Sequence, residues 1–417
     1  MSVVIRALAV SLAFVIAAGS AAAGQQGYIA PLAAPVTAPP GWSVTPSLGV
    51  SQAFDDNVNL QGPGNNSASD FVNLLSPGAS LNYNGPRNQL AVRYDGSFLL
   101  YRSSTSLDSY AQSGTLSVRR RLSSRTSLFI STDVYAAPTT EFVQLTAVPY
   151  VRVGSRAEDV GAGVESAISK RLSIVASVHA QVVHFDNNTA FTDPLLGGSS
   201  VGVTLSLHER LTEKMTLTGD YGGLRADLGQ QNDIFVIQNA MVGLERQLTR
   251  TMRISGAVGV ARLDTPTLGP TNTPTVGPTN TPTLGPSKTG ASYRFELARD
   301  LGRSVVGLQL SQSYVPSWSF GGTTQNDEVT LRLRVPLARR LYTQSLVSWR
   351  NDKPLVEATP ALKSLWIQAT LGYTARSWVR LEGYYLSTQQ SFVTNDGLLH
   401  HNQIGLQVSA SKPVRLR

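Results

Sequence analysis

The sequence predicts an all-β chain that closes into a transmembrane antiparallel up-and-down β-barrel of about 18 strands, within a range of 16–18. Three observations predict this fold class. Apolar residues recur at every second position in many segments, the connections between those segments alternate between short and long, and helical periodicity is nearly absent while charged residues make up only 15%. Alternation over about ten residues means that one face of a strand meets an apolar medium and the other a polar one.

The chain begins with a segment that we exclude from the fold. Residues 1–23 combine Arg6, an apolar run and a small-residue end, which is the layout of a secretory signal peptide, and we expect cleavage after Ala23. The chain has no cysteine, which excludes a lipoprotein and a disulfide scaffold. No later stretch approaches 18 consecutive apolar residues, so no membrane-spanning helix is expected.

The remaining chain divides by composition into three parts. Residues 24–41 form a Pro/Ala-rich periplasmic lead-in, 42–411 the barrel and 412–417 a basic C-terminal tail. Alternation places the strands at 43–54, 70–84, 88–101, 109–121, 126–136, 157–169, 173–185, 199–209, 214–223, 233–246, 251–262, 290–299, 303–315, 326–336, 340–350, 364–375, 378–388 and 400–411. A soluble sandwich would show the same alternation. The polar face, rich in Gly, Ser, Thr and charges, and the alternating connections favour the barrel.

Basic turns recur along the chain. "RRRLSSRTSL" at 119–128 has relatives near 169, 209, 246, 299 and 338, each flanked by alternating segments. Short connections follow the even strands and long ones follow the odd strands, which predicts periplasmic turns and external loops. The positive charge of the turns would lie beside the phosphates of the inner leaflet. The alternative is that turns only require polar residues.

One external loop is a low-complexity repeat. Residues 265–288 contain three copies of an eight-residue unit related to "TPTLGPTN". Proline at every fourth position removes backbone donors, so we expect an extended loop without a ladder strand.

The sequence shows no enzyme signature. The five histidines do not fall into a metal-binding or catalytic spacing, and the adjacent His400 and His401 point to opposite faces of a strand. No catalytic residue, cofactor site or metal site is expected. The net charge of +8 lies mostly in the turns, and with a signal peptide and no recognition pattern, nucleic acid is not an expected partner.

Charges on the polar face are the candidate site. If the alternation is correct, they line the lumen, where rings of charge set the selectivity of a channel. The alternative is that they pair across strands and brace the wall. The candidates are Arg93, Asp95, Arg294, Glu296, Arg332, Arg334, Arg380 and Glu382.

Two neighbouring stretches carry a family resemblance. "SVTPSLGVSQAFDDNV" at 43–58 and "DFVNLLSPGASLNYNG" at 70–85 resemble the opening hairpin of outer-membrane β-barrel porins found beside exopolysaccharide gene clusters, through Asp55-Asp56-Asn57 and Ser76-Pro77-Gly78. Outer-membrane barrels usually end on an aromatic residue, whereas this chain ends "ASKPVRLR".

The resemblance implies a barrel in the outer membrane of a Gram-negative bacterium that passes solutes and serves exopolysaccharide export. The expected partners are outer-membrane lipid and lipopolysaccharide, a polysaccharide, and periplasmic export proteins. The alternative function is a structural or surface-interaction barrel with a plugged lumen that binds a partner through its external loops.

Overall fold

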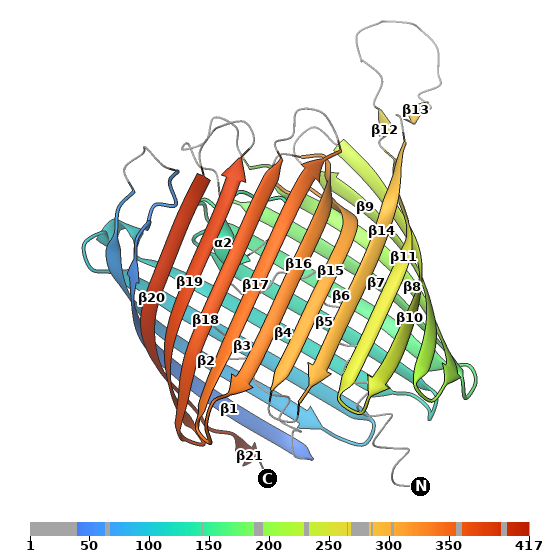
Figure 1. Ribbon diagram of the computed structural model, residues 1–417, viewed down its shortest axis with the longest axis horizontal. Helices are drawn as coiled ribbons and strands as arrows, with labels where there is room; N and C mark the ends of the chain where they lie inside the picture. Colours follow the sequence, from blue (N-terminus) through green and yellow to red (C-terminus); the bar gives the residue numbers. More distant parts are fainter. Residues whose placement is uncertain are drawn as a thin grey trace, which may run out of the picture.

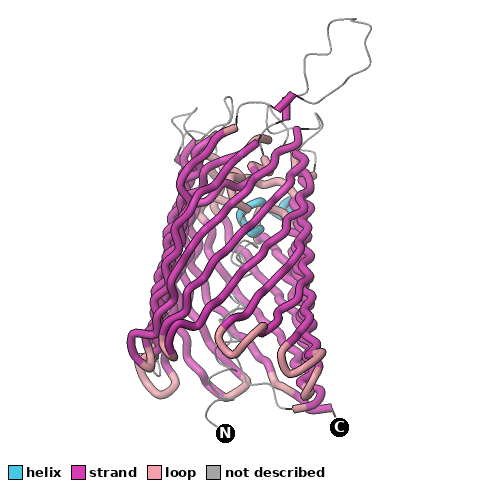
Figure 2. The backbone as a smooth tube through the Cα atoms, turned by 90° about the vertical axis from the view of Figure 1, so that its right-hand side faces the viewer, coloured by secondary structure: helices cyan, strands magenta, loops and turns pink. Residues whose placement is uncertain are grey.

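The computed structural model contains one closed antiparallel barrel (Figures 1 and 2). It describes residues 40–62, 67–143, 145–186, 195–228, 233–264, 266–267, 283–284, 287–301, 304–319, 321–355, 361–392 and 398–416. The sheet has 19 strands, of which the short β21 is an addition, so 18 strands build the wall and the predicted fold class is confirmed. The predicted signal peptide at 1–23 lies outside the described residues.

Each predicted segment overlaps one strand of the wall. The strands are β1 (Gly41–Asp55), β2 (Asp70–Asn84), β3 (Asn88–Tyr101), β4 (Ser109–Arg121), β5 (Thr126–Ala137), β6 (Ser155–Ala167), β7 (Leu172–Phe185), β8 (Gly198–Thr212), β9 (Met215–Leu228), β10 (Asp233–Thr249), β11 (Met252–Asp264), β14 (Lys288–Asp300), β15 (Val305–Pro316), β16 (Thr323–Pro336), β17 (Leu341–Pro354), β18 (Leu362–Arg376), β19 (Val379–Phe392) and β20 (Leu398–Ser411). The described helices are η1 (Thr105–Leu107) and α2 (Thr140–Val143). No described helix has the length and apolarity that crossing a membrane requires.

The barrel closes because β1 pairs with β2 on one side and with β20 on the other. The predicted basic tail contributes to this seam, since β21 (Val414–Leu416) pairs with Trp42–Val44 of β1. Ser47 pairs with Ser411 and Val44 with Val414, so β21 continues the register of β20 along the same edge. The interruption falls at Lys412 and Pro413, where proline offers no backbone N–H to the ladder.

The outer surface of the wall is an apolar belt. Val258 on β11 is 70% exposed and Leu406 on β20 is 73% exposed, although both lie in the middle of regular strands. Exposed apolar side chains of this kind occur on nearly every strand, while their neighbours in sequence face the lumen. A closed barrel with such a belt is a transmembrane barrel of the outer membrane, because closure leaves no unpaired strand edge in lipid.

The two ends of the barrel differ. Short turns join β2 to β3, β4 to β5 and the later even–odd pairs at the end where β21 lies, and the long connections lie at the opposite end (Figure 1). Short periplasmic turns and longer external loops are the rule for outer-membrane barrels, so the first end faces the periplasm. Two of the basic turns share a local structure, in which Ser123 Oγ and Ser169 Oγ accept hydrogen bonds from backbone N–H groups two and three residues later.

The expectation of no ladder strand in the proline-rich repeat was wrong at its two ends. There β12 (Pro266–Thr267) pairs with β13 (Thr283–Leu284) in a two-residue ladder. Proline keeps its carbonyl acceptor and fits the outer edge of such a short pair. The rest of the repeat lies outside the described residues, apart from Ser287 and Lys288.

Candidate functional site: the lumen and its inner segment

One long connection does not lie outside the barrel. Residues 138–143 and 145–154, between β5 and β6, fold into the outer half of the lumen, and we call them the inner segment (Figures 1 and 2; α2 is labelled in Figure 1). Val143, Val148 and Val153 are 2–3% exposed. The prediction that every long connection is an external loop was therefore wrong for this one, because its apolar side chains are buried against the inside of the wall.

Apolar packing anchors the inner segment to one side of the barrel. Val148 and Val151 belong to a cluster of buried residues with the inward-facing ends of β6, β7, β9, β10 and β11. Phe185, Leu228 and Phe235 are members from these strands, and each lies at the external end of its strand. Burying side chains of this size contributes about 1.5–3 kcal/mol each. The external half of the lumen therefore contains a hydrophobic core.

A buried charged cluster fixes the segment to the seam of the barrel. His401 on β20 has Nδ1 2.9 Å from Glu141 Oε1 of the segment and Nε2 3.0 Å from Asp55 Oδ1 of β1. The three side chains are 3%, 1% and 2% exposed. Thr388 donates to Glu141 Oε1 at 2.6 Å and Gln403 donates to Asp55 Oδ2 at 2.8 Å. A carboxylate opposite each ring nitrogen favours the doubly protonated imidazolium. We call Asp55, Glu141 and His401 the charged latch.

A second polar contact holds the backbone of the segment. Gln390 on β19 accepts from the backbone N–H of Tyr150 at 2.6 Å and donates to the carbonyl oxygen of Val148 at 3.1 Å. The same amide nitrogen donates to Ser364 Oγ at 3.0 Å. Burial raises the pKa of Tyr150 to about 12, so its hydroxyl is neutral at physiological pH.

The turn at Ala147 makes a third contact with the wall. The Ala147 N–H donates to Asp352 Oδ2 at 3.2 Å, and its carbonyl accepts from Ser319 Oγ at 2.7 Å. Asn326 supports the carboxylate by donating to Asp352 Oδ1 at 2.8 Å. Ala147 has a φ of 56°, which costs an alanine roughly 1–2 kcal/mol relative to right-handed backbone. The contacts hold the backbone in this conformation.

Arg152 connects the segment to the remaining side of the barrel. Its guanidinium donates to the carbonyl oxygens of Val58 at 2.8 Å and Leu107 at 2.7 Å, and lies over the ring of Tyr101 at 5.1 Å. Together with the latch and the two preceding contacts, the segment touches β3, β17, β19, β20 and the connection that follows β1, and it packs on β6, β7 and β9–β11. It therefore extends across the lumen from wall to wall.

The predicted lumen charges all face inward. Each shares a strand face with a buried residue two or four positions away along the same strand. These buried residues are Ser97, Ser292, Thr330 and Tyr384, which are 2–9% exposed. Arg294 and Arg332 are themselves exposed, so the lumen beside them is open to solvent. The structure brings the eight charges to one surface and does not gather them at a single ring, because they lie at different heights on β3, β14, β16 and β19.

Some of these charges are compensated locally. Arg93 forms an ion pair with Asp95 on the same strand at 2.5 Å. Glu382 accepts a hydrogen bond from Tyr342, and the guanidinium of Arg334 lies 5.5 Å from the centre of the same ring. The contacts of Tyr342 join different strands, which is the bracing role that was the alternative to a role in selectivity, whereas the Arg93–Asp95 pair lies within one strand.

The residues that hold the inner segment were not among the predicted site residues. Asp55, Glu141 and the neighbouring pair Gln390 and His401 come from three distant parts of the chain, and no spacing marks them as a group. The sequence does carry one signal, since "EFVQLTAVPYVRV" at 141–153 is too apolar for an exposed loop. Among the described residues, no group of three or more His, Asp or Glu side chains could hold a metal ion.

Comparison with known proteins finds likeness at the level of shape alone. No family model matches the chain, and no curated protein matches its sequence. Among solved structures, OpdQ of Pseudomonas aeruginosa is similar with 11% identity and a TM-score of 0.45, covering 89% of this chain and 98% of that chain. OccAB1 of Acinetobacter baumannii gives 14% identity and 0.44 over 89% and 97%. OpdK of P. aeruginosa with vanillate gives 12% and 0.45 over 89% and 99%. At these values the likeness identifies no solute.

Proposed function

We propose that this outer-membrane barrel is a gated solute channel in which the inner segment is the gate. The observation that carries the proposal is the division of the lumen. The periplasmic part is lined by solvent-exposed charges such as Arg294 and Arg332, and the external part is crossed by the inner segment. A solute that crosses from the charged part to the outside has to pass the segment.

The contacts of the segment suggest how it moves. On β17, β19 and β20 it is held by hydrogen bonds and ion pairs through Asp352, Gln390 and His401. On β6, β7 and β9–β11 it is held by apolar packing. When the segment moves away from the wall, water can replace its polar contacts, whereas water does not replace its apolar contacts. The segment therefore releases from the β17–β20 side first and stays packed on the other side, which opens a passage along β17–β20.

The structure limits the kind of solute less than it limits the movement of the segment. The sequence resemblance suggests an exopolysaccharide, and the exposed arginines favour an anionic chain. A polysaccharide needs the segment to be displaced over its whole length, because the external half of the lumen is filled by side chains such as Val148, Tyr150 and Val151. A small anionic solute needs only the β17–β20 side to open.

The absence of cysteine from the chain gives a direct test. In Ala147→Cys/Ser319→Cys, oxidation would tie the segment to the connection between β15 and β16, where Ser319 Oγ already lies 2.7 Å from the Ala147 carbonyl oxygen. We expect few open steps in a planar bilayer when the pair is oxidised, and open steps after reduction. The single-cysteine variants are the controls. Equal conductance in the two redox states would show that the segment is not the gate.

The filled external half also favours a second function, a structural or surface-interaction barrel without a through-path. This reading predicts no conductance in either redox state, even for variants that break the charged latch. To distinguish a polysaccharide exit from a channel for small solutes, the cysteine variant is reduced and placed in liposomes, and the passage of oligosaccharides of increasing length is measured.

A further inference from the structure

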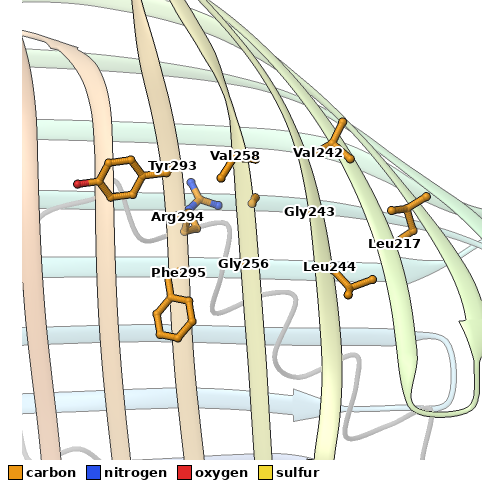
Figure 3. A pocket seen from close by; sticks show the side chains of 10 residues that line it. Leu217, Val242, Gly243, Leu244, Gly256, Val258, Tyr293, Arg294 and Phe295 are labelled. Atoms are coloured by element: carbon orange, nitrogen blue, oxygen red, sulfur yellow. The ribbon is translucent and has the colours of Figure 1, made fainter.

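The lipid-facing surface has a depression on β9, β10, β11 and β14 (Figure 3). Its floor is Gly256 on β11, which lies in register between Leu244 of β10 and Phe295 of β14. Side chains of Leu217, Val242, Val258 and Tyr293 surround it, and its volume is about 580 Å³. All of these side chains point away from the lumen, so the depression opens into the bilayer.

Neighbouring atoms do not require a glycine at position 256. A β-carbon added at Gly256 would meet only Phe295 Cδ2, at 3.9 Å, which is an ordinary contact. By contrast, a β-carbon at the inward-facing Gly259 would lie 1.9 Å from the carbonyl oxygen of Ala240. A larger side chain therefore fits at position 256, and the glycine leaves the space open between Val242 and Val258, which are 62% and 70% exposed.

Two arginines lie on the same outward face, on the periplasmic side of the depression. Arg246 is two residues beyond Leu244 on β10, and Arg299 is four residues beyond Phe295 on β14. In register, Arg246 is opposite Ile254 and Arg299 opposite Met252, so both flank β11 below Gly256. Both are exposed. Long basic side chains at this depth extend to the phosphate layer of the membrane.

We propose that this surface binds one phospholipid of the periplasmic leaflet, with an acyl chain in the depression over Gly256 and the phosphate between Arg246 and Arg299. The order along the strands matches the ligand, since the apolar depression lies toward the membrane centre and the two cations lie at its edge. Charge complementarity identifies the headgroup as a phosphate, and the periplasmic end identifies the leaflet. Glu209, an outward-facing acidic side chain on β8, lies opposite Leu217 and is separated from Arg246 by β9.

The test uses the full chain, refolded with an equal mixture of phosphatidylglycerol and phosphatidylethanolamine and examined by native mass spectrometry in a mild detergent. We expect one retained phospholipid per wild-type barrel. Gly256→Leu fills the depression, and we expect retention at least about tenfold weaker, because each excluded methylene weakens binding several-fold. Arg246→Gln/Arg299→Gln is expected to reduce retention to a similar degree.

Two control variants match these substitutions. Gly223→Leu changes another outward-facing glycine, and Arg120→Gln changes an outward-facing arginine two residues before a turn leucine, as Arg246 is. Both are expected to retain the lipid. Equal retention in wild type and Gly256→Leu would overturn the proposal, as would loss from either control. Unchanged retention in the arginine double variant would contradict the assignment of the phosphate to Arg246 and Arg299. Selective retention of added lipopolysaccharide would contradict the assignment of the lipid to the periplasmic leaflet. The shift of folded barrels in unheated gel samples identifies variants that fold.

Discussion

The amide of Gln390 holds the backbone of Tyr150 across the lumen, with the Tyr150 N–H donating to Gln390 Oε1 at 2.6 Å between residues 240 positions apart. The side-chain nitrogen of the same amide donates to the carbonyl oxygen of Val148. One side chain therefore satisfies a donor and an acceptor of the inner segment, in the way that a neighbouring strand would.

Gln390→Leu keeps the size of the side chain and removes both bonds. A buried group left without its partner costs about 1–3 kcal/mol, so we expect the segment to open more often by roughly one to two orders of magnitude. Hydrogen exchange at the amides of 147–153 measures this directly. Gln389→Leu alters the next residue, on the opposite face of β19, and should leave exchange unchanged. Equal exchange in the two variants would contradict the role of Gln390.

The charged latch predicts a difference between two adjacent histidines. His401→Asn removes the cation between Asp55 and Glu141 and leaves two carboxylates buried together, which costs about 3–5 kcal/mol. We expect frequent channel openings in a planar bilayer. His400→Asn changes the outward-facing neighbour and should behave as wild type. Adding Glu141→Gln to His401→Asn should restore part of the closed state, and failure of this rescue would argue against a charge-based latch.

Two lumen arginines are expected to differ in their effect on ion selectivity. Arg93 is neutralised locally by Asp95, whereas among the described residues no acidic side chain forms an ion pair with Arg332. Arg332→Gln should shift the reversal potential under a salt gradient toward cations, and Arg93→Gln should shift it less. The difference should be largest at low salt, because the screening length falls from about 10 Å at 0.1 M to about 3 Å at 1 M. Equal shifts would contradict local compensation.

Alkaline pH should release the inner segment at Tyr150. Burial raises the pKa of this hydroxyl from 10.0 to about 12, so ionisation favours the released state. The contribution of Tyr150 to docking is therefore fully present below pH 10 and is lost as the pH rises through about 12. The difference in tyrosinate absorbance between wild type and Tyr150→Phe isolates this group. A difference spectrum that titrates near 10 would show that Tyr150 is exposed.

The wall of the barrel could be predicted from local sequence. Val242 and Leu244 alternate with Met241 and Gly243 because a strand between lipid and a lumen presents successive side chains to opposite media. That relation needs no knowledge of distant residues, so the strand order, the number of strands and the inward faces of the charges followed from it. The short continuation at Val414 was not predicted, because its partner Val44 lies at the other end of the chain.

The inner segment could not be placed in the same way. Its sequence at 141–153 is too apolar for water, but the pattern does not say whether such a connection meets lipid, a partner or the lumen. Glu141 meets His401 only after 18 strands have closed into a ring and brought β20 beside β1.

The sequence alone thus determined an apolar outer face, a polar inner face and the alternation of turns and loops, since each depends on the neighbours of a residue along one strand or turn. The tertiary structure alone decided that the inner segment crosses the external half of the lumen and which charges hold it there. The physical reason is that contacts such as Asp55–His401 and Tyr150–Gln390 join segments whose separation in space is set by closure of the barrel and not by any local periodicity.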